Sequence, residues 1–194
     1  MAQSLCSYLK AQDPGIKISI VAPANTAPIA KRMPAVHDVI ETTFAHGRLH
    51  LKARWRIGHS LKKQRFSQAF VLPGSLKAAL VPFFAAIPLR TGYSGEPRWG
   101  LINDCHPKPR HKRDLMVDRF IDLARTKPSI RKTAFPAPQL EADLSAPQTI
   151  FRRLNKKIKS RPVLALCPGA ESGPAKQWPP ASYARLANHA TAHG

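Results

Sequence analysis

Helical and extended segments alternate along the chain from Ala2 to Lys127, and this alternation restricts the fold more than any other feature of the sequence. Short stretches rich in β-branched residues, which predict strands, separate amphipathic or basic stretches, which predict helices. Turns that contain Gly or Pro connect them. The order predicts an α/β domain, with helices on both faces of a parallel sheet. The predicted strands lie at 16–23, 36–42, 67–73 and 89–95.

The series begins with a helix. Ala2, Leu5 and Leu9 fall on one face of the first segment, and the Asp13-Pro14-Gly15 turn ends it. A doubly wound sheet ordinarily begins with a strand, so we expect this Rossmann-like sheet to lack its first strand. The other predicted helices of this part lie at 25–33, 51–66, 74–87 and 113–127.

The composition changes after Lys127. Residues 128–147 are Pro-rich and without a period, which indicates a linker. A basic helix at 148–160, a strand at 162–168 and a helix from Pro180 to the end follow. One strand with its helices is too little for a domain. We therefore predict a domain at 1–127 and, at 148–194, the first βα unit of a second Rossmann-like domain.

The net charge of +20, with a pI near 10.7, predicts an anionic partner such as nucleic acid, anionic lipid or phosphorylated saccharide. The three cysteines are far apart, so the sequence supports neither a disulfide framework nor a zinc ribbon. Cys105 and His106 lie in a charged stretch that indicates a solvated loop. With no secretory signal and no apolar run of about 20 residues, we expect a soluble, cytoplasmic protein.

An apolar stretch stops at "CPGAESGPAKQWPP", a loop that holds one cation, Lys176, before a helix. A strand that leads through a Gly-rich loop into a helix N-terminus exposes backbone N–H groups that favour anions, and a lysine adds a compact charge suited to phosphate. The spacing is not that of a P-loop. On spacing alone, an exposed lysine in a turn is the simpler explanation.

Two segments together make the sequence recognisable: "VLPGSLKAALVPFFAAIPLRTGYSGEPRWGLIND" at 71–104 and the Lys-x-Trp-Pro loop. In order and spacing they resemble the ADP-heptose:lipopolysaccharide heptosyltransferases of glycosyltransferase family 9, and most of all the heptosyltransferase II subgroup. The resemblance extends over nearly the whole chain. It implies a GT-B architecture, in which two Rossmann-like domains flank the active site.

The resemblance also implies a reaction. A heptose passes from ADP-heptose to the inner core of lipopolysaccharide, with inversion at the anomeric carbon and without a metal or other cofactor. It implies a cytoplasmic enzyme peripheral to the inner membrane of a Gram-negative bacterium, with an anionic membrane surface as a further partner and no nucleic acid.

The same resemblance assigns site residues. Lys176 matches the family lysine that contacts the donor diphosphate, and Glu171 and Ser172 lie in the loop that lines the same site. In the first domain, the segment facing the anionic acceptor contains Ser75, Lys77, Arg90 and Arg98.

Some family features fall outside the sequence. The Asp expected as catalytic base would stand just before Met1, and the "D-S-G-x-x-H" segment that completes the nucleotide site would follow Gly194. Gly74 stands where relatives more often have Asn. We therefore expect no catalytic residue within these 194 residues and an inactive fragment.

Two alternatives remain open at this stage. One is a non-catalytic remnant that binds anionic saccharide or a membrane surface through its charge. The other is a basic nucleic-acid-binding protein, against which the absence of any nucleic-acid module counts.

Overall fold

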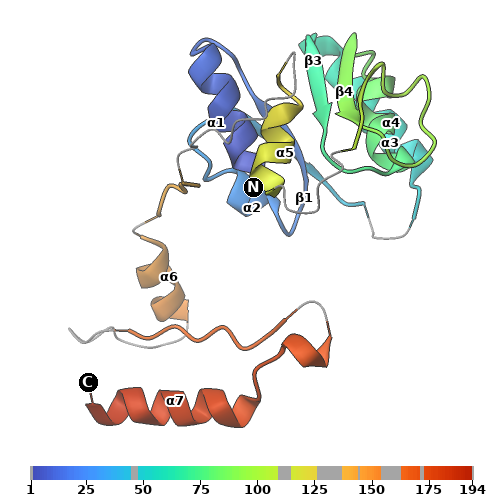
Figure 1. The fold of residues 1–194 in the computed structure, drawn as a ribbon. Coiled ribbons are helices and arrows are strands. Elements are labelled where there is room, and N and C mark those ends of the chain that lie inside the picture. Colours follow the sequence, from blue (N-terminus) through green and yellow to red (C-terminus); the bar gives the residue numbers. More distant parts are fainter. Residues whose placement is uncertain are drawn as a thin grey trace. The chain divides into compact units, whose positions relative to one another are not determined.

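The structure is a computed structural model, and it describes residues 2–44, 48–108, 115–125, 137–143, 145–153, 163–170 and 173–193. The chain divides into two compact units, Met1–Ala142 and Asp143–Gly194. Figure 1 shows the ribbon of both units.

The first unit contains the helices and strands that alternation predicts, each within a few residues of its expected place. The helices are α1 (Ala2–Gln12), α2 (Ala27–Ala30), α3 (Leu51–Leu61), α4 (Leu76–Phe84) and α5 (Met116–Asp122), with a 3-10 turn η1 (Lys62–Gln64) after α3. The strands are β1 (Ser19–Pro23), β2 (Asp38–Thr42), β3 (Gln68–Val71), β4 (Leu89–Tyr93) and β5 (Asp104–His106).

All strand pairs of this unit are parallel, as the sequence predicts. β1 pairs with β2, with Val21 opposite Ile40, and a separate sheet has the order β3-β4-β5. In the strand order 3-2-1-4-5-6 of a dinucleotide-binding sheet, the first strand lies between the second and the fourth. The interruption between β1 and β3 is therefore what a sheet without its first strand gives, so the predicted fold class is confirmed.

Strand β5 is not among the predicted strands. It covers only Asp104, Cys105 and His106, of which one residue is apolar, and the sequence indicated a solvated loop there. The segment is extended because it pairs with β4, and its composition alone does not favour a strand. In this pairing Cys105 lies opposite Gly92, and His106 lies opposite Tyr93. The interpretation as a loop was wrong because a short third strand is fixed by its neighbour rather than by its own pattern.

Helices α3 and α4 pack closely against each other (Figure 1), and α4 also contacts β3. A buried apolar cluster made by Leu61, Val81, Ala85 and Ile87 joins them. Gly58 allows the close approach, since a Cβ atom there would lie 2.5 Å from Phe84 Cβ and 2.8 Å from the Val81 carbonyl oxygen. The missing side chain at Gly58 thus sets the distance between the two helices.

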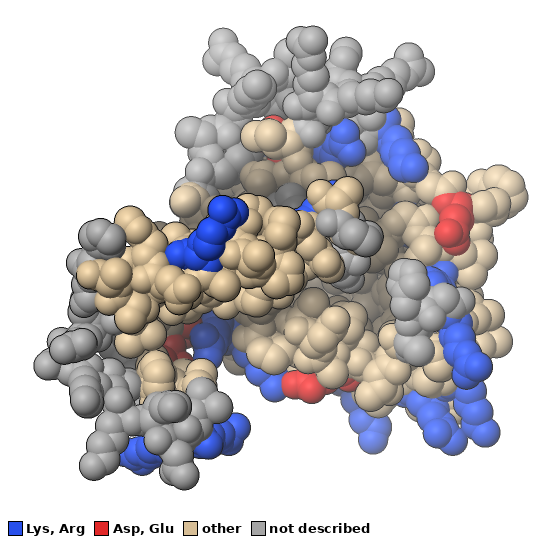
Figure 2. All heavy atoms as spheres, turned by 90° about the horizontal axis from the view of Figure 1, so that it is seen from below, with Lys and Arg blue, Asp and Glu red and all other residues tan. Residues whose placement is uncertain are grey.

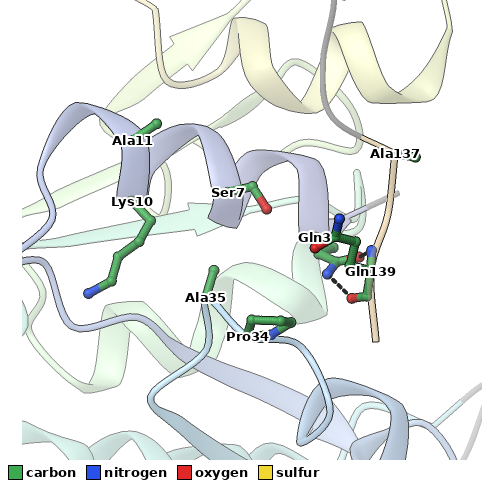
Figure 3. A pocket seen from close by; sticks show the side chains of 8 residues that line it. All are labelled: Gln3, Ser7, Lys10, Ala11, Pro34, Ala35, Ala137 and Gln139. Atoms are coloured by element: carbon green, nitrogen blue, oxygen red, sulfur yellow. Dashed lines mark hydrogen bonds between the residues drawn. The ribbon is translucent and has the colours of Figure 1, made fainter. Parts of the chain in front are cut away.

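Part of the predicted linker is bound to the first unit. Gln3, buried near the start of α1, uses its side-chain amide like a strand partner: its Nε2 donates to the Gln139 carbonyl and its Oε1 accepts from the Gln139 N–H at 3.0 Å. The Glu141 N–H donates to the Arg32 carbonyl at 2.8 Å. The segment borders a cavity of about 380 Å³, to which α1 contributes Ser7 and Lys10 (Figure 3). The chain before the second unit is therefore held at two points.

The second unit contains α6 (Ala146–Arg153), a 3-10 turn η2 (Pro174–Lys176) and α7 (Pro180–His193). The two helices begin close to where the sequence predicts them, and residues 154–160 of the predicted basic helix lie outside the described residues. The strand predicted at 162–168 is wrong for the residues described there, 163–168, which are irregular. A strand needs a neighbour for its backbone groups, and no ladder forms among the described residues of this unit.

Candidate functional site

Lys176 lies at the end of a tight turn that Gly173 makes possible. Gly173 has φ +77°, a conformation that favours glycine, and its carbonyl accepts the Lys176 N–H at 3.2 Å. The Lys176 side chain is exposed. Since α7 begins at Pro180, the lysine precedes the N-terminus of a 14-residue helix by four positions. The ammonium group and the positive end of the helix dipole both suit an anion.

Two aromatic rings fix the loop onto α7. Trp178 and Tyr183 meet edge to face, with ring centroids 4.8 Å apart, and the Tyr183 hydroxyl lies 3.3 Å from the Cys167 carbonyl oxygen, to which it donates. The Gln177 amide contacts the Ala170 carbonyl oxygen at 3.5 Å. These contacts join the irregular stretch before the loop to the helix after it. Glu171 and Ser172, the other residues assigned to this site, lie outside the described residues.

Two of the four acceptor residues predicted in the first unit, Ser75 and Arg98, belong to loops that follow the carboxyl ends of β3 and β4. This is the edge where parallel α/β sheets bind ligands. Ser75 is the N-cap residue of α4, without a side-chain capping hydrogen bond. Glu96 caps the helix instead, because its Oε2 accepts a hydrogen bond from the Leu76 N–H at 2.8 Å. A Cβ atom at Gly95 would clash with the Gly74 carbonyl, so the two loops are in direct contact.

Arg98 lies beneath these loops and is only 6% exposed. Its guanidinium donates to the carbonyls of Pro73 (2.8 Å) and Tyr93 and contacts that of Ser75 at 3.4 Å. Burial lowers the pKa of this guanidinium, while Cys105 and Glu96 act in the opposite direction. The predicted acceptor residue therefore holds the carboxyl ends of β3 and β4 together.

Arg90 has a similar set of partners at the amino end of β4. Its guanidinium donates to the carbonyls of Ile87 (2.6 Å), Leu101 (2.7 Å) and Gly100 (3.1 Å). Lys77, half-buried on the first turn of α4, offers its own carbonyl to Arg54 at 2.9 Å. Of the four predicted acceptor residues, the structure thus brings Ser75 and Arg98 together near the carboxyl end of β4. Arg90 lies at the amino end of that strand.

Replacing Arg98 by Lys tests the structural part of this arrangement. Lysine keeps the charge but cannot reach three carbonyls, so we expect Arg98→Lys to lower the free energy of unfolding by about 2 kcal/mol, measured by chemical denaturation. Arg56→Lys, at an exposed position, is the control and should stay within about 0.5 kcal/mol of the parent. Unchanged stability of Arg98→Lys would show that the guanidinium does not hold the loops.

The sequence interpretation missed Glu96 and Arg54. Glu96 gave no local signal, because its partner at Leu76 is 20 positions away. Arg54 did give a local signal, because it lies four residues before Gly58 and seven before Leu61. These spacings place it on the buried face of α3. A charged residue on the apolar face of a helix indicates a side chain with a structural partner.

No group of three or more His, Cys, Asp or Glu side chains able to hold a metal is present among the described residues. No described helix is long and apolar enough to cross a membrane.

Comparison with known proteins finds similarity to one family. The profile of glycosyltransferase family 9 (heptosyltransferase) matches residues 54–194. Lipopolysaccharide heptosyltransferase 2 of Escherichia coli is 44% identical over 192 residues, and that of Salmonella typhimurium 43% over 195 residues, each covering 96% of this chain. Lipooligosaccharide heptosyltransferase 2 of Haemophilus ducreyi is 40% identical. The chain spans about half the length of these relatives, 55% of each.

Solved structures agree. The structure of E. coli ADP-heptose lps heptosyltransferase II superposes with a TM-score of 0.85 at 38% identity, over 100% of this chain and 57% of that chain. A family 9 glycosyl transferase from Veillonella parvula superposes with a TM-score of 0.76 at 14% identity, over 97% and 55%. The α/β fold of GT-B type predicted from the sequence is confirmed for the part that the chain covers.

Proposed function

The chain belongs to glycosyltransferase family 9, and on this premise we propose that it serves the transfer of a heptose from ADP-heptose to the inner core of lipopolysaccharide. The observation that carries the proposal is the 44% identity to E. coli lipopolysaccharide heptosyltransferase 2 along nearly the whole chain. The placement of Lys176 before the N-terminus of α7 supports it.

The proposed reaction is a single displacement with inversion. An acceptor hydroxyl oxygen attacks the anomeric carbon of the heptose, the bond from that carbon to the phosphate oxygen breaks, and ADP leaves with the electron pair. A base takes the hydroxyl proton; we assign this base to none of the 194 residues. Negative charge grows on the diphosphate as the bond breaks, so groups that bind it tightly at that moment raise the rate.

We propose that Lys176 binds the diphosphate of the sugar donor, ADP-heptose. The exposed ammonium of Lys176 and the positive end of the α7 helix dipole offer positive charge that needs no metal ion. Glu171 and Ser172 are proposed to line the same site.

For the acceptor we propose two kinds of contribution. Ser75 and Lys77, at the start of α4, would contact the carboxylates and phosphates of the lipopolysaccharide inner core. Arg98 would position the loop that carries them, because its guanidinium donates to the carbonyls of Pro73 and Tyr93. Arg90 would support the acceptor segment from the amino end of β4, where it donates to the carbonyls of Ile87 and Leu101. We place this reaction at the cytoplasmic face of the inner membrane, where a growing lipopolysaccharide would be anchored.

A chimera tests the function. These 194 residues replace the matched part of E. coli lipopolysaccharide heptosyltransferase 2, and ADP release is measured with ADP-heptose and a heptose-bearing acceptor. We expect turnover above the acceptor-free background and within about a hundredfold of the relative, since the transition-state contacts of the swapped part should be present. A chimera that unfolds cooperatively like the relative but releases no ADP would contradict the proposal and favour a non-catalytic remnant.

A further inference from the structure

The outward side of α3 carries positive charge without acidic neighbours. The sequence contains no Asp or Glu between Glu41 and Glu96. Among the residues that the structure describes, no exposed cation of α3 or η1 takes part in a salt bridge. Among the described residues drawn in Figure 2, more Lys and Arg side chains (blue) are visible than Asp and Glu side chains (red). Exposed side chains of this surface, named here the cationic face, are Leu51, Lys52, Trp55, Arg56, Lys62 and Lys63.

Helical spacing brings these side chains onto one side. Lys52, Arg56 and Lys63 follow at intervals of four and seven, which a helix of 3.6 residues per turn places on one face. Leu51 and Trp55 are one turn apart beside them, and they are 51% and 49% exposed. The Trp55 ring stacks on that of His59, with centroids 5.4 Å apart. The cationic face therefore combines positive charge with an exposed apolar pair.

Contacts on the opposite side of α3 keep the cationic face turned toward solvent. Gly58 allows α3 to lie close against α4. Arg54, on the buried side, donates to the Leu49 carbonyl at 2.7 Å and the Lys77 carbonyl at 2.9 Å, and its guanidinium lies 4.0 Å from the centre of the Phe44 ring. Burial lowers the pKa of Arg54, whereas the side chains of Lys52 and Arg56 are exposed. Because the helix cannot turn without breaking these contacts, the cationic face is a preformed surface.

We propose that the cationic face docks the protein on a bilayer that contains anionic phospholipid. Each Lys or Arg near such a surface is attracted to the headgroups, and an indole ring settles at the headgroup level. Leu51 and Trp55 supply apolar area for the acyl boundary. A nucleic acid would match the charge but would leave this apolar pair in water. The inference rests on the proposed function, which anchors the acceptor in a membrane.

Vesicle sedimentation of the 194-residue chain tests the surface. Vesicles of phosphatidylcholine alone are compared with vesicles containing phosphatidylglycerol, at low and high salt, and no vesicle contains a saccharide acceptor. We expect binding to the anionic vesicles that weakens with salt. The variant Lys52→Glu/Arg56→Glu/Lys63→Glu should lose at least about tenfold in binding.

A second triple variant, Lys17→Glu/Lys108→Glu/Arg185→Glu, changes the net charge equally at exposed positions elsewhere and is expected to lose no more than about threefold. Equal losses in the two variants would mean that overall charge alone draws the chain to lipid, and the proposal would be wrong.

Fluorescence of Trp55 separates a lipid from a nucleic-acid partner. In a Trp99→Phe/Trp178→Phe background, its emission should shift to the blue on anionic vesicles and be quenched by brominated lipid. No shift, together with tighter binding to duplex DNA that the α3 variant abolishes, would assign the face to nucleic acid instead. Because these vesicles carry no acceptor, failure here leaves heptosyl transfer untouched, and failure of the chimera leaves the vesicle result standing.

Discussion

Lys176→Ala in the chimera is expected to lower turnover by about a hundred- to a thousandfold while leaving the fold intact. The loss corresponds to one preorganised contact with charge that develops in the transition state. Stability should not change, because the Lys176 side chain is exposed and the described contacts of its loop are made by backbone groups and by the side chains of Gln177, Trp178 and Tyr183. ADP release gives the rate, and thermal denaturation gives the stability.

The conservative variant and a matched control sharpen this test. Lys176→Gln keeps most of the reach but loses the charge, so it should be nearly as slow as the alanine variant. Arg185→Ala removes an exposed cation from α7 and should leave turnover within about threefold of the parent. Wild-type turnover in either Lys176 variant would contradict the proposed phosphate contact. Lys176 would then be only an exposed lysine in a turn.

Gly58→Leu is expected to lower the free energy of unfolding by at least about 3 kcal/mol, and Gly58→Ala by about 2 kcal/mol. Two effects compete in the alanine variant. Alanine improves helix propensity by about 1 kcal/mol, but its Cβ would lie 2.5 Å from Phe84 Cβ and 2.8 Å from the Val81 carbonyl oxygen. Neither atom is the end of a flexible side chain, so α3 and α4 must separate and the overlap outweighs the propensity.

Chemical denaturation followed by circular dichroism measures both variants. Gly74→Ala is the control in the same unit, because the nearest atom to its new Cβ is Gly95 Cα at 4.0 Å, and it should stay within about 0.5 kcal/mol of the parent. A Gly58→Ala variant more stable than the parent would show that propensity dominates and that the two helices are not in close contact.

The order of elements in the first unit could be predicted because each segment carries its own period. β1 and β2 are rich in β-branched residues, and α1 is ended by a Pro-Gly turn. What could not be predicted depends on neighbours: β5 is a strand only because β4 pairs with it, and residues 163–168 are irregular because no described strand does.

The candidate site divides in the same way. The turn that carries Lys176 could be predicted, since Gly173 and Pro174 restrict the backbone locally. The position of Arg98 could not, because its charge indicates exposure while its three carbonyl partners bury it. Those partners lie in the loop after β3 and at the end of β4, which only the pairing of β3 with β4 brings together.

The hydrogen bonds of Gln3 and Glu141 have a consequence for the joint between the two units. A free linker over the predicted 20 residues, 128–147, would have a root-mean-square span of about 25 Å. With Glu141 held on Arg32 and α6 starting at Ala146, far fewer than 20 residues join the two units, and Asp143 accepts hydrogen bonds from Ser145 and Ala146 at the start of α6. The effective concentration of one unit around the other rises steeply as such a tether shortens. Gln3, a residue of α1, thereby helps to set the length of the segment that joins the two units.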